Sequence, residues 1–133
     1  MAVLVDTDVF PFIFKNDSRR DLYKPYLEDQ FPYISFMTFA ELKDWTLKHN
    51  WGVKLIAELD EALKQYSIQH SNPQICKLWS EVVDESRRKG RQISTSDAWV
   101  AATAISLDVP LISHNARHFK HIERLELITE RSL

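Results

Sequence analysis

Glycine and cysteine are scarce in this chain of 133 residues, and each scarcity excludes a class of site. The two glycines, Gly52 and Gly90, cannot form a Walker A loop or a dinucleotide-binding fingerprint, since both need several glycines at fixed spacing. The single cysteine, Cys76, excludes an intramolecular disulfide framework and a cysteine-rich zinc site. Its apolar neighbours predict a buried side chain, and the low cysteine content favours a reducing cytoplasm.

Long hydrophobic runs and an excess of charge of one sign are also missing. The longest uncharged apolar run, residues 98–107, is far shorter than the ~18 residues needed to span a bilayer. No positively charged region precedes the apolar N-terminal residues, so we expect no signal peptide. The formal net charge of -2 gives no overall attraction for nucleic acid. We therefore expect a soluble cytoplasmic protein, in which any contact with nucleic acid depends on locally clustered basic residues.

Hydrophobic periodicity divides the chain into short apolar runs and longer amphipathic segments. The apolar runs predict buried strands over residues 2–5, 32–36, 109–113 and 126–129. Apolar residues at helical spacing predict helices over residues 9–14, 19–29, 38–48, 53–66, 73–89 and 94–107. Gly90 stands where glycine commonly ends a helix, and Pro25 is a candidate break or kink. Since short buried strands alternate with helices, the expected architecture is a parallel sheet in an α/β sandwich.

Polar residues near the ends of the predicted strands carry the first functional signal. Asp6 ends the first strand, and Asn115 follows the strand over residues 109–113. Glu41 and Asp97 are expected in the first turns of two helices. Ligands of open parallel sheets bind beyond the carboxyl ends of the strands, so we expect these four side chains to face one edge of the sheet.

Each of these residues also has a purely structural explanation. Glu41 follows Thr38, and Asp97 follows Ser94, at the spacing of a helix capping box. The other two polar residues suit a helix cap or a turn. Their predicted convergence favours a functional role, because like charges gathered at one edge are costly unless a divalent cation lies among them.

The candidate ligands at this edge are all oxygen donors. Such ligands select Mg²⁺ or Mn²⁺, ions that activate water and stabilise the charge that develops on a phosphoryl group. Phosphodiester hydrolysis is therefore the leading reaction class. His114 and His118 have a spacing that suits zinc, but no third histidine or cysteine stands nearby in the sequence.

Four sequence segments occur in a characteristic order. They are VLVDTDV at residues 3–9, T-x-x-E-L at residues 38–42, GRQISTSDAWVAATA at residues 90–104 and PLISHN-x-x-HF at residues 110–119. Together they resemble the PIN-domain ribonucleases, specifically the VapC toxins of bacterial and archaeal toxin–antitoxin pairs. The resemblance spans almost the whole chain, and it implies a single PIN-like domain over residues 1–133. The implied fold is a three-layer α/β/α sandwich with a short-stranded, mainly parallel central sheet.

The resemblance implies a metal-dependent endoribonuclease. In such an enzyme Asp6, Glu41 and Asp97 bind Mg²⁺ or Mn²⁺ and orient the attacking water. The fourth family position is often Asp, and here it is Asn115, a neutral ligand that lowers the negative charge of the site. The implied partners are an RNA substrate, a small VapB-like antitoxin whose tail covers the acidic cleft, and a second copy of the chain in a homodimer.

Three further residues are expected to contact the metal ligands rather than the metal itself. Asp8 stands where the family commonly has Asn, and we interpret it as a hydrogen-bonding partner of the active-site loop. Ser113 stands where the family usually has Thr, and either hydroxyl suits a neighbouring carboxylate or phosphate. Thr7, next to Asp6, is placed in the same supporting group.

Basic and aromatic residues supply candidate RNA contacts. The basic candidates are Arg91, Arg117, His118 and Lys120. Stabilisation of a helix C-terminus or simple solvation explains these residues about as well. Among the tryptophans, Trp45 lies on an apolar helical stripe, which favours core packing over stacking on a base.

Three other functions compete with the nuclease. A haloacid-dehalogenase-like phosphatase would use Asp6 and Asp8 as nucleophile and acid, but it needs an acidic loop after a late strand, where this chain has Ser113, His114 and Asn115. A non-catalytic PIN-like binding scaffold would be expected to have lost an acid, whereas all three remain. A response-regulator receiver fits the length but lacks an acceptor aspartate after a central strand.

Overall fold

The computed structural model describes residues 1–10 and 19–130 of the chain. The helix expected over residues 9–14 lies largely outside these ranges. In chain order the described elements are β1 (Ala2–Val5), α2 (Arg20–Leu27), β2 (Phe31–Ser35), α3 (Phe36–Lys48), α4 (Val53–Leu63), β3 (Ser67–Gln69), α5 (Pro73–Arg88), α6 (Thr95–Leu107), β4 (Leu111–Ile112), the 3-10 helix η1 (Ala116–His118) and β5 (Leu127–Ile128).

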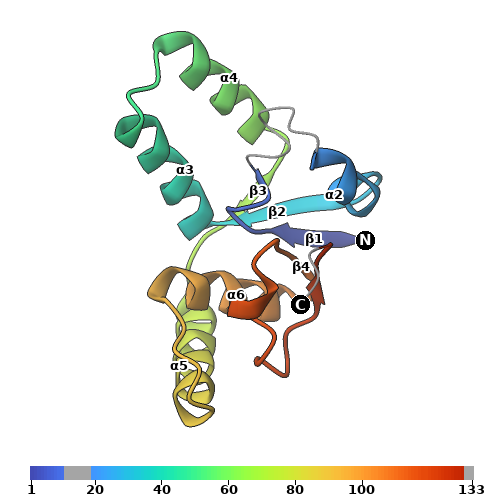
Figure 1. Cartoon of the computed structure of the whole chain (residues 1–133), viewed down its shortest axis with the longest axis vertical. Coiled ribbons are helices and arrows are strands. Elements are labelled where there is room, and N and C mark those ends of the chain that lie inside the picture. Colours follow the sequence, from blue (N-terminus) through green and yellow to red (C-terminus); the bar gives the residue numbers. More distant parts are fainter. Residues whose placement is uncertain (11–18, 131–133) are drawn as a thin grey trace.

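The strands form one five-stranded sheet in the order β3-β2-β1-β4-β5, and every neighbouring pair is parallel (Figure 1). The first strand occupies the centre, where Leu4 pairs with Tyr33 of β2 on one side and with Leu111 of β4 on the other. The predicted parallel sheet is thus confirmed. The strands are shorter than expected at several ends, and β4 and β5 have two residues each.

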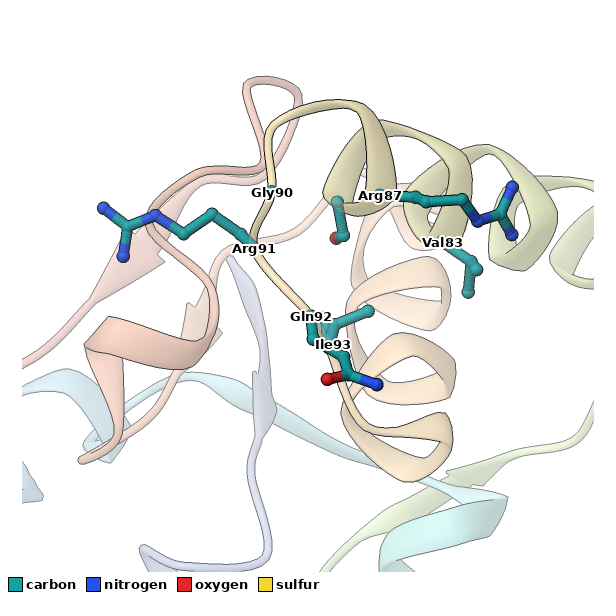
Figure 2. Close-up of a pocket in the computed structure, with 7 residues that line it drawn as sticks. Val83, Arg87, Gly90, Arg91, Gln92 and Ile93 are labelled. Atoms are coloured by element: carbon teal, nitrogen blue, oxygen red, sulfur yellow. The ribbon is translucent and has the colours of Figure 1, made fainter.

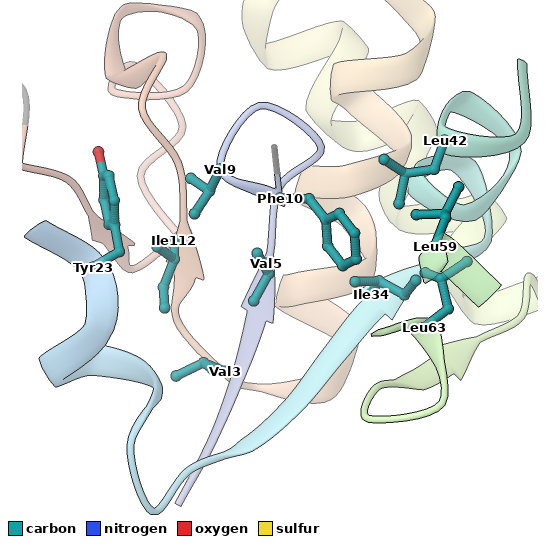
Figure 3. Packing of buried hydrophobic residues seen from close by; sticks show 10 residues of the cluster. All are labelled: Val3, Val5, Val9, Phe10, Tyr23, Ile34, Leu42, Leu59, Leu63 and Ile112. Carbon is teal, nitrogen blue, oxygen red and sulfur yellow. The ribbon is translucent and has the colours of Figure 1, made fainter. Parts of the chain in front are cut away.

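Alternate residues of β1 point to opposite faces of the sheet, as the pleat of a strand requires. Val3 and Val5 face α2, α3 and α4, where they join Ile34 and Leu42 in one buried cluster (Figure 3). Leu4 faces α5 and α6 and belongs to a second cluster with Ala98, Ala101 and Ala104 of α6. The sheet therefore lies between two helical layers (Figure 1), which confirms the expected α/β/α sandwich.

Helix α3 begins two residues earlier than predicted, at Phe36. The hydroxyl oxygen of Ser35, the last residue of β2, accepts a hydrogen bond from the backbone N–H of Thr38 at 3.0 Å and caps the helix. The expected capping box from Thr38 to Glu41 is therefore wrong, because the strand passes into the helix without a loop. Glu41 lies in the second turn, not the first, so helix capping does not explain its presence.

Helix α6 begins at the predicted cap. The Ser94 hydroxyl accepts a hydrogen bond from the backbone N–H of Asp97 at 3.1 Å. The Asp97 carboxylate does not return to the backbone of Ser94, as a complete capping box would require. The carboxylate forms a hydrogen bond with His118 instead. It is therefore not used to cap its own helix.

The structure contains a strand that the periodicity missed. Helix α4 ends at Leu63, three residues before the predicted end, and β3 then pairs in parallel with β2, with Ile68 beside Ile34. A three-residue strand of sequence Ser-Ile-Gln is too short to show an alternating pattern. It was therefore absorbed into the end of the amphipathic segment before it.

Gly90 and Cys76 illustrate one correct and one wrong expectation about α5. Gly90 follows the helix with a φ of 66°, the left-handed conformation that glycine adopts at helix ends. Cys76 is exposed rather than buried, because α5 turns Ile75 and Leu78 towards the core and leaves the position between them on the outer face.

Among the described residues, none of the helices combines the length and the apolar character needed to cross a bilayer.

We predict that Leu42→Ala destabilises the protein by about 2–5 kcal/mol, because it removes a side chain that is 1% exposed in the cluster beneath α3. The matched control is Leu47→Ala on the same helix, where the side chain is 75% exposed and the expected change is below about 0.5 kcal/mol. Urea denaturation of both variants measures the difference. Equal effects would contradict the packing of α3 described above.

Candidate functional site

The centre of the sheet contains a topological switch point. From β1 the chain continues to β2 on one side, whereas β4 lies against the other side of β1. Open parallel sheets bind ligands at such a point, beyond the carboxyl ends of the strands. Asp6 follows β1 directly, and Ser113 and Asn115 follow β4, so these residues flank the switch point.

An open cleft of about 340 Å³ lies at this edge. It brings together side chains from the β1 and β4 ends, from α3 and from the start of α6. Its lining residues are Asp6, Thr7, Asp8, Glu41, Trp45, Ser94, Ser96, Asp97, Asn115 and His118. The four residues that the sequence placed at one edge therefore share one cleft.

Asp6 is held from both sides by its neighbours. It is 5% exposed, and its Oδ1 accepts a hydrogen bond from the backbone N–H of Thr7 at 2.8 Å. Its Oδ2 accepts from the hydroxyl of Ser113 at 2.8 Å, and that hydroxyl oxygen accepts from the backbone N–H of Asn115 at 3.0 Å. The end of β4 therefore orients the carboxylate at the end of β1.

Hydroxyl groups connect Asp6's neighbour to Glu41. The Thr7 hydroxyl lies 2.8 Å from Glu41 Oε1 and 2.9 Å from the hydroxyl oxygen of Thr38. The ionised carboxylate only accepts hydrogen bonds, so Thr7 donates its single proton to Glu41 and Thr38 donates to Thr7. Thr7 thus fixes two carboxylates at once, Asp6 through its amide and Glu41 through its hydroxyl.

Asp97 approaches the same cleft from α6. Its Oδ2 lies 3.0 Å from Nδ1 of His118, whose ring is half exposed. Because an ionised carboxylate accepts, the Nδ1 atom carries the proton of this hydrogen bond. The contact joins η1 to the N-terminal turn of α6 across the mouth of the cleft.

Asp8 has one satisfied and one unsatisfied oxygen. Its Oδ2 accepts from the backbone N–H of His114 at 3.1 Å, which ties the loop after β1 to the loop after β4. Its Oδ1 is buried and has no hydrogen-bond partner among the described residues. A buried carboxylate oxygen without a donor is costly in an apoprotein and suits a nearby cation.

Burial and mutual repulsion act in the same direction on these acids. Burial, with the charges of Asp8 and Asp97, holds the pKa of Asp6 well above its usual value. Burial also raises the pKa of Asp8 and of Glu41, and the charge of Asp97 adds to both shifts. The carboxylates are therefore close enough to repel one another in the absence of a positive charge.

A family comparison supports the fold that the sheet order indicates. The model of the PIN domain matches residues 3–125 of this chain. The chain belongs to the PIN domain family.

Named relatives of this PIN domain cover nearly its full length. It is 26% identical over 128 residues to "Ribonuclease VapC1" of Haemophilus influenzae strain R2866, with 95% of this chain and 96% of the relative covered. It is 23% identical over 132 residues to "Ribonuclease VapC1" of Rickettsia felis, with 97% and 96% covered.

Solved structures give the same result for the fold. A chain of VapBC-1 from nontypeable Haemophilus influenzae matches with a TM-score of 0.83 at 25% identity, covering 97% of this chain and 98% of that chain. A chain of VapBC2 from Rickettsia felis, bound to a DNA fragment from their promoter, matches with a TM-score of 0.86 at 23% identity, with the same coverage.

The donor set of this PIN domain fits a hard divalent cation. The acids and the side-chain carbonyl of Asn115 offer oxygen atoms to the cleft. Mg²⁺ and Mn²⁺ prefer oxygen ligands. Among the described residues no three His, Cys, Asp or Glu side chains are already arranged for direct coordination. Mg²⁺ usually binds one or two carboxylates and keeps several waters, so a site of this kind needs no such cage.

The candidate RNA contacts lie in different places. Of the four, only His118 lines the acidic cleft. Arg91 borders a separate cavity of about 400 Å³ at the end of α5, where its side chain and that of Arg87 point in opposite directions (Figure 2). Arg117 and Lys120 are exposed on and after η1.

Sequence reasoning did not place Thr38, Ser94, Ser96 or Trp45 at the site. Trp45 was assigned to the core because it lies on an apolar stripe. Its position four residues after Glu41 was the available signal, since residues four apart on a helix share a face. The ring packs against the core and also lines the cleft.

We predict that Asp6→Asn stabilises the metal-free PIN domain by about 1–3 kcal/mol at pH 7, because it removes a buried charge beside Asp8 and Asp97. The gain should shrink as the pH falls towards 3.8, the ordinary pKa of the side chain, since a raised folded-state pKa destabilises the wild-type protein only where the carboxylate ionises. Thermal unfolding in EDTA across this pH range measures it.

Asp44→Asn is the control for the stabilisation, since Asp44 is an exposed carboxylate on α3. It should change stability by less than about 0.5 kcal/mol at any pH. A destabilised Asp6→Asn variant would show that the hydrogen bonds to Asp6 outweigh its burial.

Proposed function

We propose that this PIN domain is a cytoplasmic, VapC-like endoribonuclease that hydrolyses RNA phosphodiester bonds with Mg²⁺ or Mn²⁺. The observation that carries the proposal is the convergence of Asp6, Glu41 and Asp97 in one cleft at the switch point of the sheet. The names of the relatives support a ribonuclease. The oxygen donors of the acids and of Asn115, together with the unpartnered Asp8 oxygen, support a cation in the cleft.

In this proposal Asp6, Glu41 and Asp97 hold the cation, with the side-chain oxygen of Asn115 as a neutral fourth ligand. When bound, the cation activates water for attack on the phosphorus and offsets the charge that develops on the phosphate. The RNA backbone then binds at the open mouth of the cleft, where Asp97 and His118 meet.

The remaining polar residues position the ligands. Ser113 and the Thr7 amide set the orientation of Asp6, and the Thr7 hydroxyl sets that of Glu41. His118 holds one oxygen of Asp97 and leaves the other for the cleft. Partners of this kind fix ligand orientation and account for about 10–100-fold in metal affinity or activity when they are removed.

The same geometry disfavours the phosphatase alternative. A phosphatase of this kind needs an acidic loop after a late strand. Here β4 is followed by Ser113, whose hydroxyl donates to Asp6, and by the neutral Asn115. The binding-scaffold alternative leaves unexplained why three mutually repelling carboxylates share one cleft.

We further propose a VapB-like antitoxin as protein partner and a homodimer as the assembly. The support is the resemblance to chains from complexes titled VapBC and to a "Toxin-antitoxin complex from Klebsiella pneumoniae". The end of α3 exposes Leu47 and the start of α4 exposes Val53 and Leu55, apolar side chains that suit a protein contact.

We predict that the purified protein cleaves single-stranded RNA with Mg²⁺ or Mn²⁺ and loses this activity in EDTA. Asp97→Asn should reduce the cleavage rate by more than about 100-fold, and Ser113→Ala by about 10–100-fold, since the first removes a ligand and the second only orients one. Gel analysis of a labelled transcript gives both rates. Undiminished cleavage in EDTA would refute metal dependence.

We also predict that Mg²⁺ stabilises the folded wild-type protein by about 2.7 kcal/mol at a concentration 100 times its dissociation constant. Asp97→Asn should lose most of this stabilisation, whereas Asp44→Asn, outside the cleft, should keep it. Thermal unfolding with and without Mg²⁺ reports this binding without any need for RNA. Equal stabilisation of the wild type and Asp97→Asn would place the ion elsewhere.

A further inference from the structure

Trp45 is the large apolar side chain in a cleft whose other lining residues are polar. It lies on α3 one turn after Glu41 and lines the same cleft as Asp6 and Asp97. The ring is partly exposed, and it also packs against the cluster that contains Leu42. The fold therefore supports this ring from the core while leaving part of it open to the cleft.

Interactions within the fold account for Trp79 more fully than for Trp45. The Trp79 ring stacks on Trp99 with centroids 5.2 Å apart, and its indole N–H donates to the backbone oxygen of Thr95 at 3.3 Å. By contrast, the indole N–H of Trp45 donates to no residue that the structure describes, and no described aromatic ring pairs with it. Within the described part of the chain, no hydrogen bond of the indole N–H and no aromatic ring therefore engages the part of Trp45 that lines the cleft.

The charge of the cleft determines which kind of contact can attract RNA. Asp6, Asp8, Glu41 and Asp97 repel phosphates, and burial together with their mutual repulsion raises the pKa of the first three. Of the candidate basic residues, only His118 reaches the cleft. Stacking of a base on an aromatic ring is independent of this charge and contributes about 1–3 kcal/mol per base.

We propose that Trp45 stacks on an unpaired nucleobase of the RNA and so positions the adjacent phosphodiester at Asp6 and Asp97. This inference rests on the proposed nuclease function and names its substrate class, a single-stranded segment. Bases in a duplex are already stacked on their neighbours and are not available to a side chain. Trp45 is thus a positioning and specificity residue, and it takes no part in the chemical step.

The first test measures binding in EDTA, so that no cleavage is required. A labelled pool of random-sequence, single-stranded oligoribonucleotides is titrated at one fixed salt concentration. Trp45→Leu should weaken binding about 5- to 100-fold, and Trp45→Phe, which keeps a smaller ring, should weaken it less. Trp79→Phe is the matched control, and it should bind as the wild type does.

Tryptophan fluorescence supplies a readout that a merely structural role would not change. RNA should quench the emission of the wild type and of Trp79→Phe, and the quenching should be lost in Trp45→Phe. This arm decides the question even if Trp45→Leu fails to fold. Quenching that persists in Trp45→Phe would overturn the proposal.

A double-mutant cycle locates the base. In an RNA with a mapped cleavage site, each base near the site is removed in turn by an abasic substitution. At one position the loss should raise KM for the wild type while leaving Trp45→Leu unchanged, and kcat should change little in either. Equal penalties for both proteins at every position would overturn the proposal. If the Trp45 variants weaken RNA binding in EDTA as the first test expects, but the RNA is never cleaved with metal, the nuclease proposal alone fails.

Discussion

The parallel pairing of β1 with β4 is the constraint on which the site depends. It places the Ser113 hydroxyl 2.8 Å from Oδ2 of Asp6, although the two residues are 107 positions apart in the sequence. The other acids lie at the same edge of the sheet. The backbone ladder continues past the strand, since the Asp6 N–H donates to the oxygen of Ile112 at 2.9 Å. The first acid is therefore fixed by hydrogen bonds at the centre of the sheet, and α3 and α6 bring the other acids to it.

Hydroxyl groups extend the hydrogen-bond network from the sheet to α3. Thr7 links Asp6 to Glu41, and the Ser35 cap of α3 begins the chain of contacts that reaches Thr7 through Thr38. Neutral hydroxyls orient carboxylates without cancelling their charge. A lysine or arginine in the same positions would neutralise the acids and compete with a cation. The hydroxyl groups that orient the acids therefore leave the negative charge of the site unchanged.

Much of this arrangement can be predicted from residue patterns in the sequence. The apolar runs predicted four of the five strands, and the polar residues that follow them led to the cleft, because carboxyl ends of parallel strands share an edge. Shorter-range details did not follow. Strand β3 has too few residues for a pattern, and Ser35 rather than Thr38 caps α3 because the strand enters the helix directly. The predicted core packing of Trp45 is confirmed, but the same ring also lines the cleft, which periodicity does not show.

The same electrostatics links stability to function in this fold. Charges buried among like charges destabilise the metal-free protein, yet removing them would remove the ligands of the proposed ion. Asn115, where the family often has Asp, eases this conflict because it offers an oxygen without adding a charge. Without the ion the acids repel phosphates, so attraction of the substrate in that state must come from groups that are not anionic. An aromatic ring on the core side of the cleft meets that requirement without disturbing the acids, which is why Trp45, rather than the scattered arginines, is the side chain best placed to hold the RNA.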